Sequence, residues 1–202
     1  PQILKKIKSI KKVIVFSYGD KFEKQLDPQY TNFNSVLEKS KVNKVFKKFR
    51  FNHPLYILYS SGTTGIPKCI THGAGNALIE HNKEFSLHCN ISNSDKIFYY
   101  TTTGWMMWNW LIGGLSRGAT LYLYDGSPTY PCKDTLIKFC EKEKINLFGV
   151  SAKYIDYLKK ENFNFNNLDL SNLKMIASTG SPLAKESFEF VYKNIKNDVH
   201  LN

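Results

Sequence analysis

From Pro54 onward, short apolar runs alternate with segments that carry apolar residues at the spacing of amphipathic helices. This alternation is typical of βαβ units, in which strands form a largely parallel sheet and helices cover its faces. We therefore expect an α/β fold with layered sheets flanked by helices. The expected strands are residues 55–60, 69–72, 96–102, 119–126, 146–151 and 173–179, and the expected helices are 75–89, 105–118, 131–144, 152–161 and 187–196.

Three of these segments carry a more detailed prediction. The run LYILYS at 55–60 indicates a buried strand, and the run WMMWNWLIGGLSRG at 105–118 indicates a buried helix. Segment 131–144 begins with Pro131, which suits the first turn of a helix, and its apolar residues follow helical spacing. We expect that segment to form an amphipathic helix.

The first 53 residues specify their structure less clearly. Segment 11–20 has the composition of a strand, whereas the apolar spacing of segment 33–51 is mixed. We expect residues 1–53 to belong to the same domain as residues 54–202, which form its core. The final DVHLN indicates entry into another strand, so we expect the sequence to be a fragment of a larger domain.

The cysteines and histidines form no pattern of metal ligands. The four cysteines lie far apart without a C-x-x-C pair, which favours neither a zinc site nor a disulfide framework. Of the five histidines, only His81 and His88 are spaced to share a helix face. Free cysteines suit a reducing compartment, and we expect a cytoplasmic protein without a metal site.

The net charge of +11 raises the alternative of a nucleic-acid-binding module. The densest basic groups, at 5–12 and 44–48, alternate with apolar residues as solvated faces of helices or edge strands do. The pattern favours a solvated surface over a nucleic-acid site. The most apolar run, 105–115, is too short to span a bilayer, so we expect no membrane insertion.

The segment SSGTTGIPK, residues 60–68, has the composition of a phosphate-binding loop. Two glycines let the backbone turn so that several N–H groups point into one concavity, and the Ser and Thr hydroxyls add further donors. Lys68 supplies a cation, and Pro67 keeps the loop from continuing as a helix. The spacing is neither that of the Walker A loop nor G-x-G-x-x-G.

With the preceding Tyr59, this loop resembles the signature of the adenylate-forming superfamily, which contains acyl-CoA synthetases, luciferases and the adenylation domains of peptide synthetases. Two further stretches match in order and spacing. TTTGWMMWNW at 101–110 is similar to the segment that lines the acyl pocket, and STGSPL at 178–183 is similar to the turn along the adenine of ATP. The resemblance covers residues 54–202. Within the superfamily, these residues most resemble the branch that activates acetoacetate.

The resemblance implies three groups of binding residues. The ATP phosphates would be bound by Ser60, Ser61, Gly62, Thr63, Thr64, Gly65 and Lys68. The adenine would be bordered by Gly180, Ser181 and Pro182, and the acyl pocket would be shaped by Trp105, Met106, Met107, Trp108 and Asn109. Taken as bare residues, the aromatic and Met cluster would instead be core and the Gly-Ser-Pro turn an ordinary loop.

The implied reaction has two halves, with ATP, Mg²⁺ and CoA as substrates beside acetoacetate. The carboxylate is first activated as acyl-AMP and is then transferred to the thiol of CoA. We expect Asn109 to hydrogen-bond the 3-keto oxygen of acetoacetate. The superfamily's Thr-Glu or Thr-Asp motif, ribose-binding Asp and catalytic Lys are not found here, so we assign no catalytic or metal residue and expect these 202 residues alone to be inactive.

Besides a structural remnant of a truncated gene, in which the loop persists without function, two other functional classes remain open on the sequence. One is an adenylate-forming ligase for a different short or medium acid, which a panel of acids would distinguish. The other is a non-catalytic nucleotide- or nucleic-acid-binding fragment, which would show salt-sensitive retention of nucleic acid that ATP does not displace. The oligomeric state and the residues that contact CoA cannot be read from the sequence.

Overall fold

The computed structural model describes residues 2–16, 29–40, 45–60 and 65–202. The chain divides into two compact units, Pro1–Lys48 and Phe49–Asn202. In the first unit, α1 (Gln2–Lys6) precedes β1 (Ile14–Val15), and β2 (Thr31–Asn32) leads into α2 (Phe33–Lys39). The strands β1 and β2 pair in parallel. Asn32 begins α2 by accepting a 2.8 Å hydrogen bond from the backbone N–H of Asn34.

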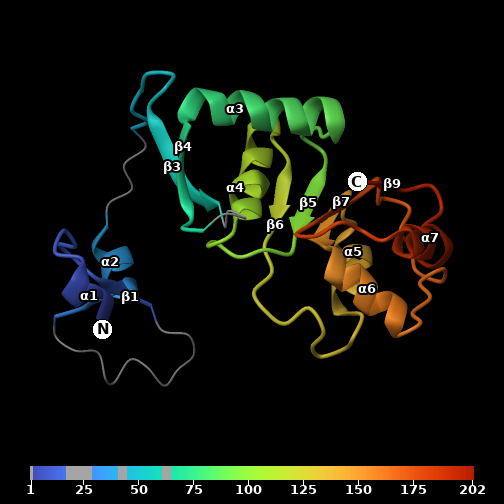
Figure 1. Ribbon diagram of the computed structural model, residues 1–202. Helices are drawn as coiled ribbons and strands as arrows, with labels where there is room; N and C mark the ends of the chain where they lie inside the picture. Colours follow the sequence, from blue (N-terminus) through green and yellow to red (C-terminus); the bar gives the residue numbers. More distant parts are fainter. Residues whose placement is uncertain (1, 17–28, 41–44, 61–64) are drawn as a thin grey trace. The chain divides into compact units, whose positions relative to one another are not determined.

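The second unit is built on a five-stranded parallel sheet with the order β6-β5-β7-β8-β9, which confirms the expected α/β fold (Figure 1). All neighbouring strands in it are parallel because each strand is joined to the next by a helical or looped crossover. The strands are β5 (Lys96–Tyr99), β6 (Thr120–Tyr122), β7 (Leu147–Ser151), β8 (Met175–Thr179) and β9 (His200–Leu201).

Side chains of this sheet alternate between two hydrophobic clusters, one on each face. Phe98, Phe148 and Ile176 point to one face, where α5 (Thr135–Glu143), α6 (Ala152–Lys160) and α7 (Lys185–Asn194) pack. Ile97, Leu147 and Met175 point to the other, where the π-helical segment η2 (Glu84–His88) and α4 (Met106–Gly113) pack. Figure 1 shows α5, α6 and α7 grouped apart from α3 and α4.

Helix α3 (Ala74–Lys83) runs directly into η2, and α4 runs into the 3₁₀ turn η3 (Gly114–Arg117). The expected helices at 75–89 and 105–118 are thus both present. The second was expected to be a buried helix, but of its residues only Met107, Leu111 and Gly114 are buried. A helix that packs on a sheet buries one stripe and leaves the opposite side for other contacts.

Two strands stand outside the parallel sheet as an antiparallel hairpin, β3 (Pro54–Ser60) and β4 (Lys68–Gly73). The prediction that 55–60 is a buried strand is right about the strand and wrong about burial, since Leu55, Ile57 and Tyr59 are all exposed. A continuous apolar run indicates a strand covered on both faces, whereas this two-stranded sheet covers neither side of β3 completely in the described structure.

The segment at 131–144 also differs from its prediction at one end. The helix is present as α5, but it begins at Thr135, so Pro131 lies before it and not in its first turn. The Thr135 hydroxyl accepts a 3.1 Å hydrogen bond from the backbone N–H of Cys132. This bond closes a turn ahead of the helix, and three residues separate the proline from the first helical position.

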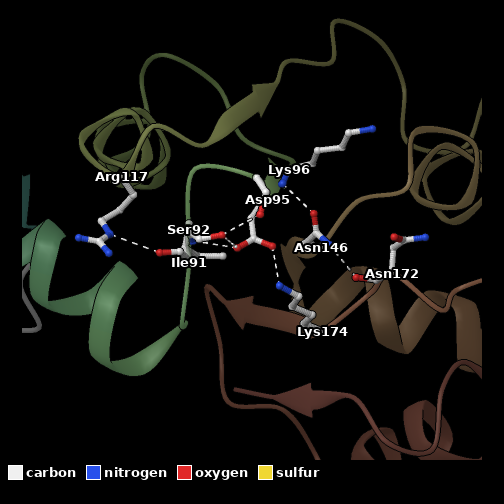
Figure 2. A network of polar contacts seen from close by, with 9 residues as sticks. Ile91, Ser92, Asp95, Lys96, Arg117, Asn146, Asn172 and Lys174 are labelled. Carbon is white, nitrogen blue, oxygen red and sulfur yellow. Dashed lines mark hydrogen bonds and ion pairs between the residues drawn. The ribbon is translucent and has the colours of Figure 1, made fainter.

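A polar network holds the amino ends of three strands together (Figure 2). Asp95, only 2% exposed, accepts hydrogen bonds from the backbone N–H and the hydroxyl of Ser92, each 2.8 Å, and from the ammonium of Lys174 at 2.7 Å. Asn146 accepts a 2.8 Å bond from the backbone N–H of Lys96 and donates to the carbonyl of Asn172. This end of the sheet is occupied by structural contacts. A ligand-binding site is therefore expected at the opposite end, where the carboxyl ends of the parallel strands lie.

Candidate functional site

Three cavities lie around helix α4 and the carboxyl ends of the parallel strands. The smaller cavity, about 200 Å³, is lined by Glu84, Tyr99, Met106, Met107, Trp110, Ala177, Ser178, Thr179 and Asn202. The larger cavity, about 500 Å³, is lined by Tyr56, Leu58, His72, Asn76, Ala77, Glu80, His81, Glu84, Met106, Asn109 and Trp110. The threonine cavity, about 390 Å³, is lined by Tyr99, Tyr100, Thr101, Thr102, Thr103, Trp108, Leu111, Leu123, Tyr124, Asp125 and Gly126.

The predicted phosphate loop connects the two strands of the hairpin. Ser60 ends β3 and Lys68 begins β4, and the two residues are direct partners in the antiparallel register. Gly65 has φ of +128°, a conformation that L side chains rarely adopt, and Lys68 is exposed. The predictions on Ser61, Gly62, Thr63 and Thr64 lie outside the described residues. The hairpin therefore places a hydroxyl and a cation opposite each other at the base of the loop.

Four of the five residues predicted for the acyl pocket are divided among the three cavities. Met106 and Met107 line the smaller cavity, Asn109 lines the larger one and Trp108 lines the threonine cavity. Trp105, which is 55% exposed, precedes α4 and lines none of the three. Successive residues of an α-helix point about 100° apart, so a run of four cannot face one ligand.

The smaller cavity brings two of the sequence motifs together. Met106 and Met107 come from the start of α4, whereas Ser178 and Thr179 come from the end of β8. The hydroxyl of Ser178 is buried without a hydrogen-bond partner among the described residues. A buried hydroxyl in that state is costly by about 1–3 kcal/mol, and a bound polar ligand group would satisfy it.

The predicted adenine turn follows directly on this cavity. Gly180, Ser181 and Pro182 come immediately after β8, and all three are exposed. Gly180 has φ of +91°, and a β-carbon built on it would meet no atom within 4 Å. The turn is therefore open to a ligand that lies along the end of β8, next to the smaller cavity.

Burial shifts the pKa of one ionisable side chain in each of the smaller and the larger cavity. In the smaller cavity, burial raises the pKa of Tyr99, so its phenol is neutral at physiological pH. In the larger cavity, burial lowers the pKa of His81, against the opposing effect of the nearby Glu80 carboxylate. His81 is thus held in its neutral form near pH 7, and the carboxylate of Glu84 is paired with Lys83 at 2.8 Å.

Residues that line the smaller cavity but were not predicted as site residues from the sequence include Tyr99, Glu84 and Trp110. A signal for Trp110 was present, because positions 106 and 110 are one helical turn apart and so share a face. Tyr99 and Glu84 gave no such signal. They are brought to the cavity by sheet pairing and by the path of the chain after α3.

Other site types receive no support from the described part of the chain. No group of three or more His, Cys, Asp or Glu side chains in the described ranges is arranged to hold a metal ion. His81 lines the larger cavity, and His88 lies 3.9 Å from the carboxylate of Glu84. Among residues 2–16, 29–40, 45–60 and 65–202, no helix has the length and apolar character needed to cross a bilayer.

Comparison with known proteins gives a consistent result. The chain matches the family described as AMP-binding enzyme over residues 2–201. It is 54% identical over 158 residues to the acetoacetyl-coenzyme A synthetase of Rhizobium meliloti, covering 78% of this chain and 24% of that protein. It is 43% identical over 208 residues to the acetoacetyl-CoA synthetase of Gallus gallus, covering 98% of this chain and 31% of that protein.

The fold has a close counterpart among solved structures. The acetoacetyl-CoA synthetase from Streptomyces lividans superposes with a TM-score of 0.85 at 35% sequence identity, covering 99% of this chain and 31% of that one. The chain therefore spans between about a quarter and a third of the length of the relatives that it matches.

Proposed function

This chain belongs to the AMP-binding enzyme family, and we propose that it forms the nucleotide- and acyl-binding part of an ATP-dependent acid–thiol ligase that acts on acetoacetate. One observation carries the proposal most directly. The smaller cavity joins Met106 and Met107 of the predicted acyl segment to Ser178 and Thr179, which lead into the predicted adenine turn. An acyl-adenylate needs its acyl group and its nucleotide side by side in this way.

The proposed reaction has two half-reactions. A carboxylate oxygen of acetoacetate attacks the α-phosphorus of ATP, the bond to the bridging oxygen breaks, and pyrophosphate leaves with that electron pair. The sulfur of CoA then attacks the acyl carbon, AMP leaves, and the thiol proton passes to solvent or base. Both steps depend mainly on positioning and on neutralising charge.

For the phosphates, we propose that the loop at 60–68 binds the β- and γ-phosphoryl groups of ATP. Its contributions would be the backbone N–H groups around the glycines and the hydroxyls of the Ser and Thr residues. Lys68, opposite Ser60 at the base of the hairpin, would add a mobile positive charge. This arrangement would stabilise the pyrophosphate as it departs.

For the nucleoside and the acid, we propose that Gly180, Ser181 and Pro182 border the adenine and that Met106 and Met107 contact the acyl chain. The supporting facts are the open backbone of Gly180 and the position of both Met residues in the smaller cavity. A cavity of about 200 Å³ is smaller than the roughly 300–1,000 Å³ typical of drug-sized ligands, which suits a short acid.

Mg²⁺ and CoA are the other proposed participants. The described residues offer no cluster of metal-binding side chains, so we assign none of them to Mg²⁺, which would supply charge neutralisation as the counterion of ATP. The residues that contact CoA are likewise unassigned. We also propose a cytoplasmic location, supported by the four cysteines, all of which are free.

The test is acid-dependent exchange of labelled pyrophosphate into ATP, measured on the full-length gene product with acetoacetate, acetate, propionate, butyrate, hexanoate and octanoate. We expect the highest kcat/KM with acetoacetate. In the same assay Lys68→Ala should lower exchange by about 10²-fold or more, whereas Lys193→Ala, an exposed residue on α7, should leave it unchanged. If the protein prefers another acid, the proposal that acetoacetate is the substrate is wrong. If no acid supports exchange, the proposal of a ligase is refuted.

The proposed contact of Asn109 with the 3-keto oxygen has its own test. Asn109 lines the larger cavity, so the contact requires the acid to extend past Met106. Asn109→Ala in the full-length protein should then lower the acetoacetate-to-butyrate ratio of kcat/KM by about tenfold. An unchanged ratio would remove Asn109 from keto recognition.

A further inference from the structure

Tyr99 carries a buried phenol into the cavity that holds the proposed acyl contacts. It ends strand β5 and lines the smaller cavity together with Met106 and Met107. Its side chain is almost fully buried and belongs to the same hydrophobic cluster as Met107. The hydroxyl of Tyr99 is therefore a polar group next to the place where the acyl chain is proposed to lie.

The ring of Tyr99 is held on two sides. The ring of Trp110 lies 5.9 Å away at an interplanar angle of 76°, which is an edge-to-face contact. On the side of the sheet, the ring lies against the backbone of Gly149. These contacts limit the motion of the ring, so the hydroxyl is presented at one place. A side chain that recognises one group of a ligand needs this kind of preorganisation.

The hydroxyl of Tyr99 is only weakly engaged within the protein. It donates to the carbonyl of Val150 at 3.5 Å, which is much longer than the usual distance of about 2.7–2.8 Å between two such oxygens. Because burial raises the pKa of Tyr99, the phenol keeps its proton at physiological pH. Rotation about the C–O bond would direct this proton toward a closer acceptor in the smaller cavity.

A keto oxygen accepts hydrogen bonds and donates none, so it needs a donor from the protein. The ionised carboxylate of Glu84 cannot supply one, and it already lies 2.8 Å from the ammonium of Lys83. The hydroxyls of Ser178 and Thr179 belong to the end of β8, which leads into the proposed adenine turn. Tyr99 combines a donor with a place in the buried cluster of Met107.

We propose that the hydroxyl of Tyr99 donates a hydrogen bond to the 3-keto oxygen of the acid and so favours a 3-oxo acid over the plain acid of the same length. The proposal rests on the proposed ligase function and adds a specificity-determining residue to it. Contact with Tyr99 keeps the keto group in the smaller cavity, whereas contact with Asn109 would place it past Met106.

The experiment measures acid-dependent pyrophosphate exchange by the full-length wild type, Tyr99→Phe and Tyr154→Phe, with acetoacetate and butyrate. Tyr99→Phe removes the hydroxyl and keeps the ring. It should lower kcat/KM for acetoacetate and leave that for butyrate unchanged, so that their ratio falls about tenfold. A purely structural role would lower both values together. Tyr154, which is buried on the other face of the sheet, is the matched control, and Tyr154→Phe should leave the ratio unchanged.

A second measurement applies if Tyr99→Phe shows no exchange with either acid. The rise in Tm that each acid causes in the presence of a non-hydrolysable ATP analogue reports binding without turnover. Acetoacetate should raise the Tm of the wild type more than butyrate does, and this difference should disappear in Tyr99→Phe. A difference that persists in the variant would overturn the contact.

The outcomes separate the two proposals. If the wild type prefers acetoacetate to butyrate and Tyr99→Phe keeps that ratio, the Tyr99 proposal is overturned and the ligase proposal stands. In that case a lower ratio in Asn109→Ala would place the keto group in the larger cavity. A wild type that uses both acids equally well also overturns the role of Tyr99. Absence of exchange with every acid overturns both proposals.

Discussion

The ring of Tyr99 lies directly against the backbone of Gly149, its partner across the parallel pairing of β5 with β7. A β-carbon built on Gly149 would overlap the Cγ, Cδ2 and Cε2 atoms of that ring. The absence of a side chain at 149 therefore lets the ring of Tyr99 pack against the neighbouring strand. Because Tyr99 lines both the smaller and the threonine cavity, this pair of residues shapes the site from within the sheet.

Gly149→Ala should therefore destabilise the protein, because the new methyl group can be accommodated only if Tyr99 or the strand moves. Overpacking of this kind costs about 1–3 kcal/mol. The midpoint of urea-induced unfolding, followed by tryptophan fluorescence, would measure the loss. The control is Gly104→Ala, where a β-carbon meets no atom within 4 Å and the change should stay within about 0.5 kcal/mol. Equal stabilities of the two variants would contradict the role of Gly149.

Asp95→Asn should destabilise the protein near neutral pH by about 1.5–3 kcal/mol, because it removes the charge from the hydrogen bonds with Lys174 and Ser92. Unfolding in urea at pH 7 would show the loss. Glu189→Gln is the control, since its carboxylate is largely exposed and lies 3.8 Å from Lys185. That exposed pair should contribute less than about 1 kcal/mol.

The same aspartate predicts a dependence of stability on pH. Burial raises the pKa of Asp95, but the hydrogen bonds from Lys174 and Ser92 outweigh it and hold the pKa below the ordinary value of 3.8. A carboxyl with a depressed folded-state pKa contributes stability above its unfolded pKa and loses it as the pH falls through the folded value. The wild type should lose its advantage over Asp95→Asn below about pH 4. A stability difference that stays constant from pH 7 to pH 3 would contradict this.

Ser187 of α7 links that helix to α6 on the face of the parallel sheet where both helices pack. Its fully buried hydroxyl donates to a carboxylate oxygen of Asp156 on α6 at 2.5 Å and accepts from the ammonium of Lys159 at 2.8 Å. Ser187→Ala should cost about 1.5–3 kcal/mol. A double-mutant cycle with Asp156→Ala should give a coupling energy of at least about 0.5 kcal/mol, and strictly additive effects would show that the contact does not join α6 to α7.

The four cysteines should differ in reactivity toward a thiol reagent. Cys69 and Cys132 are exposed, whereas burial raises the pKa of the Cys140 thiol to about 12 and that of Cys89 to about 11. Because the thiolate is the reactive form, iodoacetamide at pH 8 should modify Cys69 and Cys132 first and Cys140 only after unfolding. Peptide mass spectrometry at increasing times would give the order, and early modification of Cys140 would contradict its place in the core.

The sequence predicted correctly which segments of the parallel sheet region are strands and which are helices, because the apolar pattern of each segment is local. Apolar runs of four to six residues bounded by helical segments gave β5, β7 and β8, and the spacing of Leu136, Ile137 and Cys140 gave α5. Burial was harder to predict. Residues 55–59 form a continuous apolar run in the sequence, yet the hairpin leaves Leu55, Ile57 and Tyr59 exposed.

For this protein, the sequence by itself determined the fold class and the three motifs that point to an adenylate-forming enzyme, because periodicity and a contiguous loop signature depend only on near neighbours in the chain. The tertiary structure decided which of those residues share a cavity. The 100° step of α4 divides Met107, Trp108 and Asn109 among three different cavities. Sheet pairing and the π-helical turn bring in Tyr99 and Glu84. Contacts between residues distant in sequence depend on how elements pack, and no local pattern records that packing.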